Sequence, residues 1–110
     1  MVAEIRAEWV KRLRSGDYKK GSIMLHNTGT GAYCPLGVLC EIAADAGVIT
    51  RLSDGTYQGH EADAPWFAFP PIEVNGWAGL TIEQMSEVCK VNDGSGMTFA
   101  EMADKIEREL

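Results

Sequence analysis

The sequence lacks long hydrophobic runs, an even set of cysteines and the known glycine-rich phosphate-binding motifs. No apolar segment in the 110 residues approaches the roughly 18 that a membrane-spanning helix requires, and the charged, amphipathic first residues are unlike a signal peptide. Hydrophobic residues make up 45% and charged residues 24% of the chain, which is typical of a folded globular domain. We therefore expect one domain spanning residues 1–110, located in the cytoplasm, with no membrane partner.

The three cysteines, Cys34, Cys40 and Cys89, form an odd set. Thiols stay reduced in the cytosol, so a disulfide framework is not expected. The spacing of the first two matches neither a zinc knuckle nor a redox pair. Neither His26 nor His60 lies at a ligand spacing from another candidate, so local hydrogen bonding is the favoured role for both. The sequence therefore predicts no metal site and no cofactor.

Cys34 is the residue that most suggests catalysis. It directly precedes Pro35, where we expect a helix to begin, and a helix N-terminus can lower the pKa of a thiol. A cysteine-dependent enzyme that uses Cys34 is therefore an alternative hypothesis. Because buried cysteines outnumber reactive ones, packing is the favoured role for Cys34. It is favoured more strongly for Cys40 and Cys89, which fall on the apolar faces of predicted helices.

The net charge of −6 is unevenly distributed along the chain. Residues 1–25 contain six basic and three acidic residues, a net charge of +3, which leaves −9 for the remainder. Binding to duplex nucleic acid depends largely on neutralising phosphates, so an acidic chain argues against such a partner. The basic N-terminal part could still bind a small anion.

Hydrophobic spacing and capping signals predict an α+β fold with about four helices and one or two short hairpins. A stripe formed by Val2, Ile5, Trp9 and Leu13 predicts a first helix that ends at Ser15–Gly16. Three further helices are expected at 35–46, 81–91 and 98–109; the first begins at a proline, and the other two begin with capping boxes.

The remaining segments carry strand and turn signals. Residues 22–26 could form a short strand, 48–58 has the pattern of a hairpin with an Asp-Gly turn, and 72–77 suggests a short helical turn. The glycine-rich stretch 92–96 is predicted to connect the last two helices. It lacks the acidic pattern of a calcium loop, and the acidic helix that follows is poorly suited to a DNA groove.

Two patches are candidates for binding. The first is basic, and its candidate ligand-binding residues are Arg12, Arg14, Tyr18, Lys19 and Lys20. Its cations, stacking ring and nearby glycines suit a nucleotide-like anion, although a solvated helix face is the simpler interpretation. The second is the aromatic, proline-containing loop 65–71, whose candidate partner-binding residues are Trp66, Phe67 and Phe69. Such a loop either packs on the core or contacts a partner protein.

Blocks of sequence spread over most of the chain resemble a family of small bacteriophage and prophage proteins. These blocks are Leu-Arg-Ser-Gly-Asp-Tyr-Lys-Lys-Gly after Trp9, Tyr-Cys-Pro-Leu-Gly-Val-Leu-Cys at 33–40, Trp-Ala-Gly-Leu at 77–80, and Asn-Asp at 92–93 with Thr-Phe-Ala-Glu-Met-Ala-Asp-Lys-Ile-Glu at 98–107. In that family a cysteine often stands where this chain has Pro35. The departure argues against vicinal-thiol chemistry or a metal cluster here.

The resemblance implies a phage accessory protein in the cytoplasm of a host cell. Our leading hypothesis is a non-enzymatic binding protein that counters host defence, by blocking a host protein or by sequestering a small anionic, nucleotide-like signal. The alternatives are the cysteine-dependent enzyme and a minor structural phage protein. The sequence is also compatible with a homo-oligomer.

Overall fold

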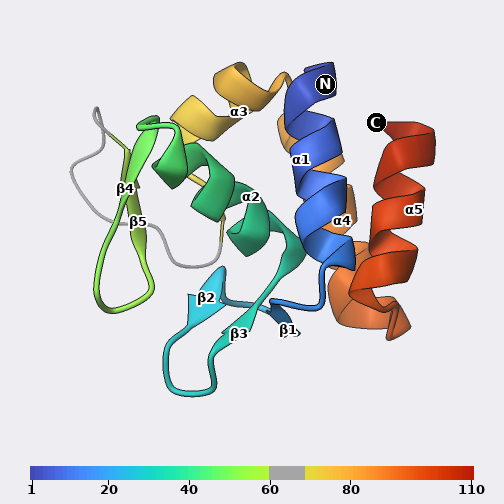
Figure 1. The fold of residues 1–110 in the computed structure, drawn as a ribbon, viewed down its shortest axis with the longest axis horizontal. Helices are drawn as coiled ribbons and strands as arrows, with labels where there is room; N and C mark the ends of the chain where they lie inside the picture. The colour runs from blue at the N-terminus through green and yellow to red at the C-terminus, as the bar shows by residue number, and fades with distance from the viewer. Residues whose placement is uncertain (60–68) are drawn as a thin grey trace.

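A computed structural model describes residues 1–59 and 69–110 of the chain. Its described part contains five helices and five short strands, arranged in two small sheets (Figure 1). The helices are α1 (Ala3–Arg14), α2 (Pro35–Asp45), α3 (Ile72–Ala78), α4 (Ile82–Ser95) and α5 (Phe99–Glu109); the strands are β1 (Lys19–Lys20), β2 (His26–Asn27), β3 (Ala32–Tyr33), β4 (Ile49–Arg51) and β5 (Tyr57–Gly59). The predicted α+β class is confirmed.

Helix α2 forms the centre of the core, and eight of its eleven residues are buried. Helices α1 and α4 pack against it, and α5 packs along α1 (Figure 1). Trp9 of α1 is fully buried, and its indole Nε1 donates a hydrogen bond of 2.8 Å to the carbonyl oxygen of Pro35. This bond joins α1 to the first turn of α2. Carbonyl groups in that turn also accept hydrogen bonds from amides within the helix.

A close backbone contact fixes the strand end of the molecule against α2. The carbonyl oxygen of Leu25 accepts a hydrogen bond of 3.2 Å from the amide of Cys34. A Cβ atom on Gly37 would lie only 1.8 Å from that same oxygen. Only glycine lets the helix approach this closely, which gives a physical reason for the glycine in the block at 33–40.

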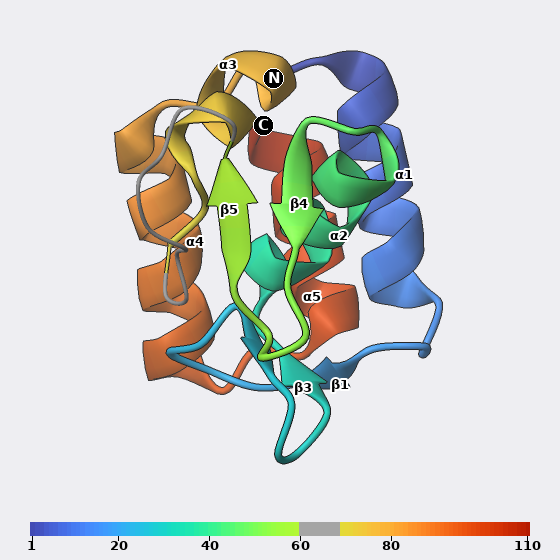
Figure 2. The ribbon, with the colours of Figure 1, turned by 90° about the vertical axis from the view of Figure 1, so that its left-hand side faces the viewer.

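The two sheets lie at one end and one side of the helices (Figure 2). In the first, β3 is central, parallel to β1 and antiparallel to β2. In the second, β4 and β5 pair antiparallel, which confirms the hairpin predicted at 48–58. None of the helices found in residues 1–59 and 69–110 is both long and apolar enough to cross a membrane.

Most helix predictions are confirmed, including both capping boxes, in which Thr81 and Thr98 accept from the third residue of α4 and α5. Two local predictions are wrong. Residues 22–25 form bends, and only His26 of the expected strand 22–26 pairs in a sheet. The expected connector 92–96 belongs largely to α4, which continues to Ser95 and ends at Gly96 in the left-handed conformation.

The helix continues through Gly94 in spite of the cost of glycine in a helix, because Asn92 makes a tertiary contact. Asn92 is buried, and its Nδ2 donates a hydrogen bond of 3.0 Å to the carbonyl oxygen of Gly21. This tertiary contact favours helix over the turn that the composition suggests.

Candidate functional site

The predicted basic patch is divided between two faces of α1. Arg12 faces α2, and its Nη2 lies 3.0 Å from Oδ2 of Asp45. Arg14 faces α5, and its Nη2 lies 2.6 Å from Oδ1 of Asp104, with Glu107 also in contact. Residues two apart on a helix point in nearly opposite directions. The two arginines therefore do not converge, and each is paired with carboxylates.

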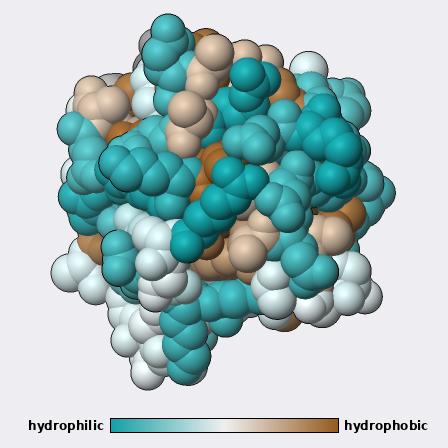
Figure 3. All heavy atoms as spheres, turned by 45° about the vertical axis from the view of Figure 1, so that its right-hand side comes forward, coloured by the Kyte–Doolittle hydropathy of each residue, from teal (hydrophilic) through white to brown (hydrophobic). Residues whose placement is uncertain are grey.

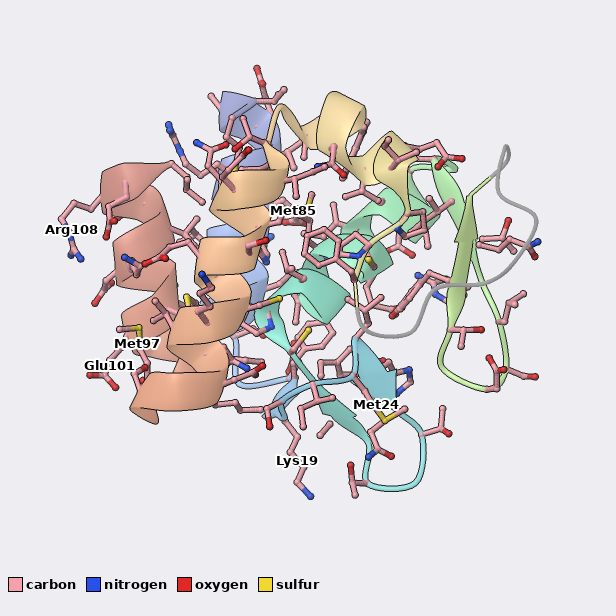
Figure 4. The ribbon with its side chains drawn as sticks, turned by 180° about the vertical axis from the view of Figure 1, so that it is seen from behind. Lys19, Met24, Met85, Met97, Glu101 and Arg108 are labelled. Atoms are coloured by element: carbon pink, nitrogen blue, oxygen red, sulfur yellow. The ribbon has the colours of Figure 1, made fainter. Side chains whose placement is uncertain are left out.

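The other three predicted ligand residues are also spread out. The hydroxyl of Tyr18 accepts a hydrogen bond of 3.3 Å from Arg12. Lys19 is exposed and points away from the body of the protein (Figure 4). Lys20 is half-buried, and its charge helps to lower the pKa of Glu101, which is lowered chiefly by the amide of Thr98. Arg12 and Tyr18 lie together, whereas Arg14 lies elsewhere.

Arg12 and Tyr18 belong to a larger group, which we call the arginine–tyrosine cluster. Its members come from α1, α2, both sheets and the segment before β1. They are Arg12, Tyr18, His26, Tyr33, Glu41, Asp45, Arg51 and Tyr57.

The charged half of the cluster is organised by the two acidic residues of α2. Glu41 and Asp45 are one helical turn apart, on one face. Arg51 of β4 contacts both, with its Nε 3.2 Å from Glu41 Oε2 and its Nη2 2.7 Å from Asp45 Oδ1. Asp45 is therefore held between Arg51 and Arg12, and its pKa is lowered, chiefly by the hydrogen bond from Arg51.

The aromatic half of the cluster surrounds Tyr33. The imidazole of His26 stacks on this ring at a centroid distance of 4.0 Å and an interplanar angle of 6°. Tyr18 meets the same ring edge-on at 5.1 Å. Tyr57 is buried, and its hydroxyl donates a hydrogen bond of 2.6 Å to Glu41; burial, followed by this contact, raises its pKa.

Sequence reasoning found only two members of this cluster, because the rest lie on separate elements. One signal was available in α2. Its segment Pro-Leu-Gly-Val-Leu-Cys-Glu-Ile-Ala-Ala-Asp has only two charged residues, four apart. Two carboxylates on one face of an otherwise apolar helix indicate cationic partners from other elements.

The cysteines lie in the core. Cys34 and Cys40 are buried, and Cys89 is half-buried against the core. Burial raises the pKa of Cys34 to about 12 and also raises those of Cys40 and Cys89. This is opposite to the lowered pKa that a cysteine nucleophile requires. In the ranges that the structure describes, no group of three or more His, Cys, Asp or Glu side chains could hold a metal ion.

The predicted aromatic loop is described only in part. Trp66, Phe67 and His60 lie outside the described residues. Phe69 is half-buried and packs against the core. The structure therefore assigns Phe69 at least a packing role, and a partner-binding role for this loop stays a prediction.

A groove between α4 and α5 is a further surface feature. Its volume is about 300 Å³, and it is lined by Glu83, Gln84, Glu87, Val88, Lys105, Ile106, Glu109 and Leu110. Lys105 is only 18% exposed and pairs with Glu109 at 2.8 Å. The groove therefore combines an apolar floor with a net negative lining. The surface over α1 and α5, by contrast, is largely hydrophilic (Figure 3).

Together these features describe a small α+β domain with five helices and five short strands in its described residues. The model of one family matches residues 1–110, and its description is "Domain of unknown function (DUF8296)". The chain belongs to this family. A search of curated proteins and a search of solved structures each gave no match.

Proposed function

We propose that this protein is a non-catalytic accessory protein of a bacteriophage that binds a host protein through the arginine–tyrosine cluster. The phage setting rests on the sequence resemblance described above. The observation that carries the binding role is the convergence of two partly exposed tyrosines, Tyr18 and Tyr33, with two arginines, Arg12 and Arg51, from four parts of the fold. Tyrosine and arginine are enriched among the residues that dominate binding energy at protein interfaces.

The cluster is held in place before any partner arrives. Asp45 and Glu41 fix Arg51, and His26 and Tyr18 hold Tyr33 from two sides. Fixing side chains in advance lowers the entropy that binding must supply. This favours a contact surface that recognises another folded protein.

A host protein is a better partner for this surface than a nucleotide-like anion. The two arginines of the predicted anion patch, Arg12 and Arg14, point to different faces. Their guanidinium groups lie 3.0 Å and 2.6 Å from the nearest carboxylate oxygens. A phosphate would have to compete with those carboxylates for the guanidinium groups. A protein surface can instead contact the rings and the outer edges of the paired guanidinium groups.

The test is recovery of the protein from infected host cells, followed by native mass spectrometry. We expect one host protein in stoichiometric amount with the wild type and with Arg108→Ala, an exposed arginine on the outer side of α5 (Figure 4). Tyr18→Ala and Arg51→Ala should each lose that host protein. A bound nucleotide-sized mass would replace the proposal with ligand sequestration, and a clean protein mass would refute it.

The cysteine-enzyme alternative has its own test. At neutral pH a thiol with a pKa of about 12 is almost entirely protonated. We therefore expect Cys34 to resist alkylation in the native protein and to react once denaturant unfolds the chain. Mass spectrometry of the modified peptides checks this. Rapid, pH-dependent modification of native Cys34 would restore the enzyme hypothesis.

A further inference from the structure

The turn before β2 holds an isoleucine in a strained and exposed position. Ile23 has a φ of 73°, and the amide of Met24 donates a hydrogen bond of 2.8 Å to the carbonyl oxygen of Ser22. This is a γ-turn with positive φ at its central residue, a rare and strained form. For a β-branched residue such a φ is an outlier. The Ile23 side chain is also 69% exposed.

The turn is kept in this shape by contacts on both sides. Before it, the amide of Gly21 donates to Tyr33 at 2.7 Å, and the carbonyl of Gly21 accepts from Asn92 at 3.0 Å. After it, Leu25 is fully buried, and its carbonyl is fixed against α2. Within the free protein, glycine would relieve both the strain and the exposure. A costly residue in a rigid frame indicates a contact made by its side chain.

The α4–α5 groove has the complementary chemistry. Its floor includes Val88 and Ile106, and its lining has three glutamates against the single Lys105. Residues 18–33, which carry the Ile23 turn, contain two lysines and no acidic residue. An apolar projection on a basic segment therefore matches an apolar groove with an acidic lining. The volume of about 300 Å³ accommodates an isoleucine side chain with room to spare.

The two features lie at opposite ends of the helices. Gly21, two residues before Ile23, accepts a hydrogen bond from Asn92 near the C-terminal end of α4, and Met24 lies at the same lower end of the molecule in Figure 4. The groove is formed by the first half of α4 and the last half of α5. A molecule cannot therefore fill its own groove with its own turn. Two copies would meet through different surfaces, which is a heterologous, head-to-tail contact.

We propose that the Ile23 turn of one molecule enters the α4–α5 groove of a second copy, so that the protein associates head to tail. The contact is small compared with a standard protein interface, so the association is weak and reversible. Neither Ile23 nor any residue that lines the groove belongs to the arginine–tyrosine cluster. The two proposals can therefore fail separately.

Sedimentation velocity of the full chain, from micromolar to millimolar concentration, measures this association. The wild type should show a rising average mass. Ile23→Gly should weaken the association by about tenfold or more, because the buried side chain is lost. It should also raise Tm, because the turn is relieved. These opposite effects are expected if Ile23 makes the contact between the two copies. If Ile23 were needed only for folding, its replacement by glycine would lower Tm.

Two charge-reversal variants distinguish a contact in the groove from an effect of the overall charge of the protein. Glu87→Lys places a cation in the groove lining, and Asp17→Lys makes the same change of charge at an exposed residue outside the groove. Both variants lower the overall negative charge equally. We expect only Glu87→Lys to lose association.

Mixing the two defective variants tests the head-to-tail geometry directly. Ile23→Gly keeps the groove, and Glu87→Lys keeps the turn, so the mixture should form a one-to-one dimer and nothing larger. A monomeric wild type at millimolar concentration would overturn the proposal. So would association that survives Ile23→Gly, or a mixture of the two variants that stays monomeric.

Discussion

The starts of helices α4 and α5 and the segment from β1 to β3 obtain their conformations in different ways. The starts of α4 and α5 are specified locally, by capping boxes at Thr81 and Thr98. The β1–β3 segment depends on residues far away in sequence, because Gly21 is bound by Asn92 and the backbone at Leu25 abuts Gly37. A segment held from outside can keep a strained residue that local preferences would reject.

The largest expected effect comes from adding one methyl group at the contact between α2 and the strand segment. Gly37→Ala places a Cβ 1.8 Å from the carbonyl oxygen of Leu25. We expect a loss of about 3 kcal/mol in the free energy of unfolding. Urea denaturation measures it. Gly76→Ala in α3 is the matched control, since no atom lies within 4 Å of the added Cβ; it should be neutral or stabilising. Equal stability of the two variants would contradict the close contact.

A smaller loss is expected from removing the link between α4 and the strand segment. Asn92→Ala deletes the donor to the Gly21 carbonyl, and we expect a loss of about 2 kcal/mol. Asn92→Asp keeps the size but places a carboxylate oxygen against a carbonyl oxygen, so it should be at least as destabilising. Denaturation of both variants, with hydrogen exchange at residues 19–33, checks this. A neutral Asn92→Asp would show that the hydrogen bond is unimportant.

The capping variant tests the locally specified region. In Thr98→Ala the amide of Glu101 loses its acceptor, at an expected cost of about 1 kcal/mol. Hydrogen exchange should increase in the first turn of α5 and stay unchanged in β1–β3. If protection fell equally in both regions, the contrast between local and distant control would be lost.

The smallest effect concerns the ion pairs of the cluster. The pKa of Asp45 is lowered in the folded state, so its stabilisation is present at neutral pH and is lost as the pH falls through that lowered pKa. Asp45→Asn should therefore be less stable than the wild type near neutral pH and equally stable in acid. Asp45 is 49% exposed, so solvent screening keeps this difference below that of Thr98→Ala. If the difference in stability between Asp45→Asn and the wild type did not depend on pH, it would not arise from the ionised carboxylate of Asp45.

The elements that the sequence predicts correctly are those set by residues close together in the chain. The capping boxes, the proline at the start of α2 and the Asp-Gly hairpin were all visible in short windows. Prediction from the sequence failed at residues 22–26, where distant contacts impose the γ-turn at Ile23. It failed again at the end of α4, where Asn92 is fixed by a residue 71 positions earlier.

The candidate site was harder to predict than the fold. The charge of Arg12 and the ring of Tyr18 mark both residues as candidates in the sequence, but their partners Asp45 and Tyr33 are distant in the chain. The grouping of Arg12 with Arg14 followed from proximity in the chain, whereas the helix turns them to different faces. Spatial grouping of side chains on separate elements is a property of tertiary packing.

Trp9, whose indole donates a hydrogen bond to Pro35, is also a natural fluorescent probe of the core. Its indole is fully buried and donates to a backbone carbonyl at the junction of α1 and α2. Separation of these two helices would move the ring into water and shift its fluorescence to longer wavelength. The difference between the wild type and Trp9→Phe isolates this signal from those of the other tryptophans. The assembly of the helical core can thus be followed without an attached dye.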